Sequence, residues 1–188
     1  MGAGIAQVAA AAGYGVVMRD IEDRFVQGGL SKIDARLQRS VAKGELDPEA
    51  QQAIRSRIHG TLDMAAAAKS DLIIEAVPED PALKKAVLRE VDALAAPDAI
   101  LATNTSSISI GELAAATRRP ERFVGMHFFN PVPVMKLVEV VRGRMTGLET
   151  VRIALEVCTR MGKTAVEVHD FPGFVSNRVL MPMINEAL

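Results

Sequence analysis

Segments with the helical spacing of apolar residues alternate along most of the chain with short apolar runs that resemble β-strands. We expect helices over residues 3–12, 22–42, 81–95, 111–116, 148–161 and 174–188, with a further helix beginning at residue 48. We expect strands over residues 15–20, 71–77, 99–103, 123–128, 136–141 and 164–168. This alternation is typical of an α/β domain built on a mostly parallel sheet.

Two helices carry more local signals. Four apolar residues of the 22–42 segment fall near one face, which predicts that this face is buried. They are Phe25, Ile33, Leu37 and Val41. Asp47 directly precedes Pro48, and this order favours Asp47 as the N-cap of a helix that begins at the proline.

A polar cluster, residues 104–107 (NTSS), directly follows the expected strand 99–103. Ligands of open α/β sheets bind outside the carboxyl ends of the parallel strands. The sequence therefore predicts that this cluster lies at a ligand site.

The composition restricts the possible partners. The 188 residues carry 22 basic and 23 acidic side chains, a formal net charge of −1, so a nucleic-acid partner is disfavoured. The single cysteine permits no intramolecular disulfide, and with the three histidines it forms no zinc-binding spacing. No apolar run is long enough to span a bilayer. We expect a cytoplasmic protein without a membrane or metal partner.

The first residues resemble the end of a dinucleotide-binding loop. A G-x-G-x-x-G pattern precedes a helix in such sites, and here Gly2 and Gly4 stand where its last part would be. Asp20 ends the next expected strand, where an acid binds the adenosine ribose hydroxyls. NAD is therefore the favoured cofactor, although the neighbouring Arg19 keeps NADP as an alternative.

His127 and Glu139 lie on two successive strands, 12 residues apart, joined by a proline-containing connection. This arrangement could bring the carboxylate beside the imidazole, which would orient the ring and make His127 a general base. The alternatives are a structural histidine and a solvent-facing glutamate on an edge strand. Ser106 lacks a Ser-His-Asp context, so we interpret it as a hydrogen-bonding residue and not as a nucleophile.

Several ordered segments resemble the short-chain L-3-hydroxyacyl-CoA dehydrogenases, of the 3-hydroxybutyryl-CoA dehydrogenase type, over essentially the whole chain. These segments are residues 2–7 (GAGIAQ), 75–79 (EAVPE), 103–107 (TNTSS), 127–139 (HFFNPVPVMKLVE) and 170–175 (DFPGFV), the last together with Asn177 and Arg178. The 127–139 segment is the most specific of them.

The resemblance implies roles for individual catalytic residues. It makes His127 the base that takes the proton of the substrate 3-hydroxyl, with Glu139 as its electrostatic partner. It implies that Ser106 contacts the substrate hydroxyl, that Asn177 hydrogen-bonds the substrate near the reacting centre, and that Asn130 helps to order the site.

The resemblance also implies a cofactor site for NAD. Gly2 would lie at the phosphates and Asp20 at the adenosine ribose. Glu79, Lys84 and Asn104 would line the cofactor and nicotinamide side, although Lys84 could equally be a solvated helix lysine.

At the level of architecture, the resemblance implies a Rossmann-like, doubly wound α/β domain over residues 1–170 that lacks its first strand. Residues 171–188 would begin an all-α substrate and dimerisation domain, so that the parent protein is a homodimer with an acyl-CoA substrate. Two alternatives remain at this stage: a catalytically inert dinucleotide-binding fragment, and a related hydroxy-acid dehydrogenase that does not use CoA.

Overall fold

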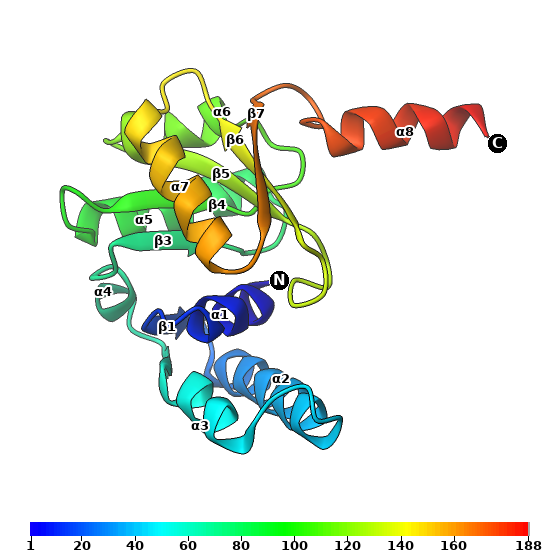
Figure 1. Cartoon of the computed structure of the whole chain (residues 1–188). Helices are drawn as coiled ribbons and strands as arrows, with labels where there is room; N and C mark the ends of the chain where they lie inside the picture. Colours follow the sequence, from blue (N-terminus) through cyan, green and yellow to red (C-terminus); the bar gives the residue numbers. More distant parts are fainter. Residues whose placement is uncertain (188) are drawn as a thin grey trace.

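The computed structural model describes residues 1–187, and its larger sheet has five strands (Figure 1). Their spatial order is β3 (Leu72–Glu75), β4 (Ile100–Thr103), β5 (Phe123–Phe128), β6 (Leu137–Arg142) and β7 (Thr164–His169). All neighbouring strands are parallel except β5 and β6, which are antiparallel. This mostly parallel arrangement confirms the expected Rossmann-like α/β class.

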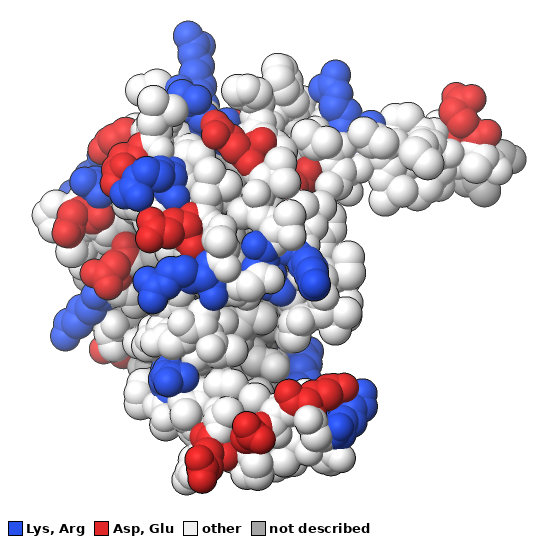
Figure 2. All heavy atoms as spheres, in the orientation of Figure 1, with Lys and Arg blue, Asp and Glu red and all other residues white. Residues whose placement is uncertain are grey.

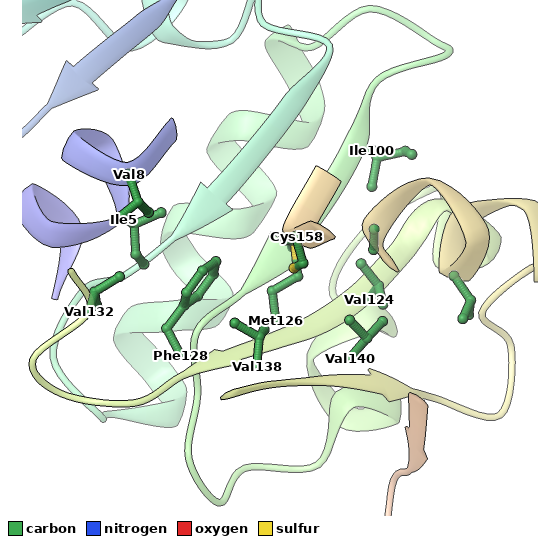
Figure 3. Packing of buried hydrophobic residues seen from close by; sticks show 13 residues of the cluster. Ile5, Val8, Ile100, Val124, Met126, Phe128, Val132, Val138, Val140 and Cys158 are labelled. Carbon is green, nitrogen blue, oxygen red and sulfur yellow. The ribbon is translucent and has the colours of Figure 1, made fainter. Parts of the chain in front are cut away.

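Helices cover both faces of this sheet. Successive strand residues point to opposite faces and therefore pack against different helices. Val124, Met126 and Val140 pack with α1 (Gly2–Ala11) and α7 (Leu148–Arg160), as Figure 3 shows. Leu101, Phe123 and Val141 belong instead to the cluster formed with α5 (Pro81–Leu94) and α6 (Ile110–Ala114). The sheet is therefore doubly wound.

A second, two-stranded parallel sheet joins β1 (Val16–Arg19) to β2 (Ile58–Thr61). It packs with α2 (Asp23–Ala42) and α3 (Pro48–Ser56) below the larger sheet in Figure 1. Helix α1 links the two parts: Ile5 and Val8 pack in the core of the large sheet, whereas Ala6 and Ala10 pack against α2 and β2.

The structure corrects several expectations from the sequence. Strand β2 and the short helix α4 (Met64–Ala67) were not expected. Phe25 is 45% exposed, and the buried stripe of α2 is instead Val26, Leu30, Ile33 and Leu37. Asp47 stands at the N-cap of α3 as expected, but within the described residues its side chain makes no capping hydrogen bond.

The sequence pattern does not predict strand β2 because the strand contains a glycine. A Cβ at Gly60 would overlap Cγ1 of Val26, so close packing against α2 requires glycine there. Glycine is unfavourable in strands in general, so the tertiary contact overrides the local preference.

Helix α8 (Ser176–Glu186) projects away from the rest of the molecule (Figure 1). Charged side chains of both signs are scattered over the body, whereas the surface of α8 is largely uncharged (Figure 2). Its apolar side chains are exposed, among them Val179, Leu180, Met181, Met183 and Ile184. Within residues 1–187, no helix is long and apolar enough to cross a membrane.

The turn that leads into α8 is fastened by Asp170. Its carboxylate accepts hydrogen bonds from the backbone N–H groups of Ile110 and Gly111 and from the Ser109 hydroxyl, at 2.8–3.0 Å. These donors belong to the first turn of α6, which leaves backbone N–H groups without helical acceptors. Asp170 thereby holds the chain against the body just before α8 begins.

Candidate active site

A histidine and a glutamate form a buried pair at the end of the large sheet. His127 on β5 lies directly opposite Glu139 on β6 in the antiparallel ladder, and Nδ1 of the ring is 2.8 Å from Oε2 of the carboxylate. The two residues are only 5% and 2% exposed. Phe129 and Phe174 pack against the ring, with ring centroids 4.6 and 5.8 Å from that of His127. The interpretation of Glu139 as a solvent-facing residue is therefore wrong.

The second carboxylate oxygen of Glu139 binds the start of α8. Oε1 accepts hydrogen bonds from the backbone N–H of Val175 at 3.1 Å and of Ser176 at 2.9 Å, and from the Ser176 hydroxyl at 3.0 Å. Burial raises the pKa of Glu139, but the hydrogen bonds from His127, Ser176 and Val175 outweigh this and hold the pKa below its ordinary value. The carboxylate is therefore ionised near neutral pH and acts as an acceptor only.

Glu79 organises the polar loop that follows β4. Its Oε1 accepts hydrogen bonds from the Thr105 hydroxyl at 2.5 Å and from the Ser106 backbone N–H at 2.8 Å. Burial raises the pKa of Glu79, whereas these bonds and the Lys84 ammonium lower it, and the net direction is downward. The position of Ser106 therefore depends on Glu79.

Lys84 lies beneath this loop and is 1% exposed, so the interpretation as a solvated lysine is wrong. Its Nζ lies 2.9 Å from Oε1 of Glu75 and 3.2 Å from Oε2 of Glu79. The Thr103 hydroxyl also donates to Glu75, at 2.7 Å. Lys84 thus joins the end of β3 to the Glu79 side chain from within the protein.

The two predicted asparagines of the sheet edge differ in burial. Asn104 is buried, and its Oδ1 accepts a hydrogen bond from the Phe128 backbone N–H at 2.9 Å, which ties the end of β4 to the residue after His127. Asn130 is exposed, in the connection between β5 and β6.

Asn177 and Ser106 meet across a hollow of about 570 Å³, which both residues line. The Asn177 amide donates to the Ser106 carbonyl at 3.0 Å. Since Asn177 follows Ser176 in the first turn of α8, that turn contacts both the polar loop and the His127–Glu139 pair. The structure thus links Ser106, Asn177, Glu139 and His127 in one region.

The residues at the carboxyl ends of the strands fit a dinucleotide. Helix α1 begins at Gly2 beside Ala76, which follows β3, and a Cβ at Gly2 would still be 3.9 Å from the Ala76 Cβ. The N–H groups of the first helical turn lack helical acceptors and suit a diphosphate. Asp20 follows β1 and is exposed, which suits contact with ribose hydroxyls. Gly4 has a packing role instead, because its Cβ would lie 2.9 Å from that of Val132.

The sequence analysis assigns no role to three residues of the site, which are Glu75, Thr105 and Ser176. An acid within the apolar run 72–77 is a signal that could have identified Glu75, because a carboxylate buried in a strand needs partners. Thr105 belongs to the polar cluster but was not assigned a role there. Nothing in the sequence distinguishes Ser176, whose importance depends on a contact with a strand 37 residues away.

The fold and this edge of the sheet define a dinucleotide-binding α/β domain with a buried histidine–glutamate pair. Residues 1–171 match the family described as "3-hydroxyacyl-CoA dehydrogenase, NAD binding domain", and the chain belongs to that family. NAD is the cofactor of this family of domains.

Named relatives are longer than this chain. The chain is 48% identical over 188 residues to the probable 3-hydroxybutyryl-CoA dehydrogenase of Bacillus subtilis (strain 168), covering all of this chain and 66% of that protein. The crystal structure of (S)-3-hydroxybutyryl-CoA dehydrogenase from Ralstonia eutropha superposes with a TM-score of 0.98 at 44% identity, over 100% of this chain and 66% of that one. The crystal structure of 3-hydroxybutyryl-CoA dehydrogenase from Escherichia coli K12 superposes with a TM-score of 0.97 at 44% identity, over 100% of this chain and 40% of that one.

Proposed function

We propose that the protein containing this chain oxidises a short-chain (3S)-3-hydroxyacyl-CoA to the 3-oxoacyl-CoA with NAD. The observation that carries the proposal is the buried hydrogen bond of 2.8 Å between His127 and Glu139. Family membership and the names of the relatives support the reaction class.

His127 acts as the general base. Because the Glu139 carboxylate only accepts, Nδ1 of His127 carries the hydrogen of their shared bond, and the lone pair of Nε2 is left to accept the proton of the substrate 3-hydroxyl. NAD, which Gly2, Asp20, Glu79 and Asn104 would hold, would supply the acceptor for the hydride that leaves C3. Glu139 then stabilises the imidazolium that has formed.

The remaining polar residues orient the substrate and cofactor in this proposal. Ser106 and Asn177 contact the substrate hydroxyl and its surroundings, and Asn130 orders the connection beyond β5. Gly2, Asp20, Glu79 and Asn104 line the NAD site, with Lys84 holding Glu79 from beneath. In this proposal residues 1–170 form the NAD-binding domain, and residues 171–188 begin a helical domain through which the protein dimerises. The exposed apolar surface of α8 supports the second part. We place the enzyme in the cytoplasm.

The test is NADH formation from (S)-3-hydroxybutyryl-CoA and NAD. The 188-residue chain is compared with a version extended upstream and downstream, because the relatives are longer. His127→Gln should lower turnover by about 10²- to 10⁴-fold, which is the usual contribution of a general base. The affinity for NAD should be unchanged. His59→Gln, on an exposed position of β2, is the matched control and should retain full activity.

Retention of full activity in His127→Gln would contradict the proposed mechanism. Faster oxidation of free 3-hydroxybutyrate than of its CoA thioester would replace the CoA substrate with a free hydroxy acid. If the extended protein is folded and binds NAD but oxidises neither compound, it is a binding module and not a dehydrogenase.

A further inference from the structure

Glu139 Oε1 accepts three hydrogen bonds among the described residues, and only the one from the Ser176 hydroxyl comes from a side chain. The other two donors are the backbone N–H groups of Val175 and Ser176 itself, so only the hydroxyl, at 3.0 Å, depends on the identity of a side chain. Ser176 is the first residue of α8 and is half-buried. A substitution there can therefore change the environment of Glu139 without altering either strand of the sheet.

The two oxygens of Glu139 compete for the same negative charge. Each donor on Oε1 draws charge away from Oε2, and Oε2 is the oxygen that holds the ring of His127. A carboxylate with fewer donors on Oε1 holds a protonated imidazole more strongly. The hydroxyl at residue 176 thus acts on His127 through Glu139, without touching the ring.

We propose that Ser176 is a positioning residue of the site, whose hydroxyl sets how strongly Glu139 holds the protonated His127. The inference rests on the proposed function, because it assumes that His127 exchanges a proton during the reaction. It also links the base to the attachment of α8, since the next residue, Asn177, bonds the Ser106 carbonyl. The start of α8 and the state of His127 therefore depend on each other.

Other charged groups near Glu139 remain the same when Ser176 is replaced. Glu167 and His169 on β7 and Arg178 on α8 line the cavity of about 530 Å³ beside Glu139. Arg142 on β6 pairs with Glu167 at 3.6 Å. The rings of Phe129 and Phe174, which are uncharged, lie beside the ring of His127. Two variants that differ only in a hydroxyl at residue 176 share all these groups, so the difference between them isolates the hydrogen bond.

The test compares Ser176→Val with Ser176→Thr, which have nearly the same shape and differ in the hydroxyl. The protonation of His127 is followed by NMR of the imidazole carbon during a pH titration of each folded protein. We expect the midpoint for His127 to move up by about half a pH unit in Ser176→Val, which corresponds to part of one hydrogen bond. Ser176→Thr should titrate within error of the unchanged protein. In the active protein, the acidic limb of the pH profile of kcat/KM should move in the same direction.

A second pair of variants, Ser31→Val and Ser31→Thr on the exposed side of α2, should leave the His127 titration and the activity unchanged. Identical His127 midpoints in Ser176→Val and Ser176→Thr, or a lower midpoint in the valine variant, would overturn the proposal. The NMR readout does not depend on turnover. A shifted midpoint in a protein without dehydrogenase activity would therefore support the role of Ser176 while rejecting the proposed reaction.

Discussion

Two buried carboxylates at the same end of the large sheet are held by different partners. Glu75, the last residue of β3, contacts the Lys84 ammonium at 2.9 Å and accepts from the Thr103 hydroxyl. Glu139 contacts the His127 ring at 2.8 Å and accepts from the start of α8. A lysine ordinarily keeps its proton at neutral pH, whereas an imidazole exchanges its proton near neutrality.

This difference fits the proposed function, in which one pair supports the site and the other takes part in the reaction. The Glu75–Lys84 pair holds Glu79, and through it the loop that contains Ser106. In the proposed reaction the Glu139–His127 pair gains and loses a proton, and Glu139 is also bonded to the start of α8. The comparison predicts that damage to the first pair chiefly lowers stability, and damage to the second chiefly lowers activity.

The largest expected effect is on activity, in Glu139→Gln. The amide retains one oxygen for the α8 donors, so its NH₂ group faces His127 and donates to Nδ1. The ring must then carry its hydrogen on Nε2, which removes the lone pair that accepts the substrate proton. We expect kcat to fall by about 10²- to 10⁴-fold, measured as NADH formation in the active protein.

Glu167→Gln is the matched control, because Glu167 lies on β7 beside the same cavity and is exposed. It should keep its activity within a small factor. A Glu139→Gln variant that is as active as Glu167→Gln would show that the carboxylate does not determine the state of His127.

The next effect is on stability, in Lys84→Met. The methionine fills much of the lysine volume but leaves Glu75 and part of Glu79 without their cation. Removal of one partner of a buried ion pair typically costs about 3–5 kcal/mol of unfolding free energy. Denaturant-induced unfolding of the variant measures this loss.

Two further variants sharpen that measurement. Lys85→Met removes a neighbouring, more exposed lysine that pairs with Glu112, and exposed pairs contribute only about 0–1 kcal/mol. The double variant Lys84→Met with Glu75→Gln should be more stable than Lys84→Met alone, since the unpaired charge is gone. A single Lys84→Met variant as stable as Lys85→Met would contradict the supporting role of Lys84.

Much of the fold is predictable from the sequence because long apolar patterns determine it. Every helix and strand expected from the pattern is present, most of them with ends that differ by a few residues. The failures have tertiary causes: Gly60 is needed for contact with Val26, and Phe25 lies one position away from the stripe that α1 covers. Local patterns contain no information about the helix that packs on them.

The site is predictable in part for a related reason. His127 and Glu139 are joined by a short connection, so their pairing follows from two neighbouring strands in register. Glu75 and Lys84 meet because α5 folds back on the end of β3, and the sequence alone could not exclude a solvated lysine. Ser176 and Glu139 are separated in the chain by α7 and β7, so their contact depends on how these two elements pack.

The smallest expected effect is on the pH dependence of stability. The pKa values of Glu139 and Glu79 are below their ordinary value of 4.5, because hydrogen bonds outweigh burial. The unfolded chain therefore binds more protons than the folded protein in acid, and stability falls with falling pH. The contribution of these groups is fully present above about pH 4.5 and is lost as the pH drops through their lowered values.

We expect the unfolding free energy, measured by urea denaturation at each pH, to decline more steeply below about pH 4.5 than between pH 5 and 7. Glu139→Gln and Glu79→Gln should each flatten this decline, because an amide binds no proton in this range. Asp98→Asn is a suitable control, because Asp98 is exposed, and it should leave the slope as it was. An equal slope in all three variants would mean that other carboxylates carry the acid sensitivity, and that neither the histidine pair nor the loop carboxylate stabilises the fold through its charge.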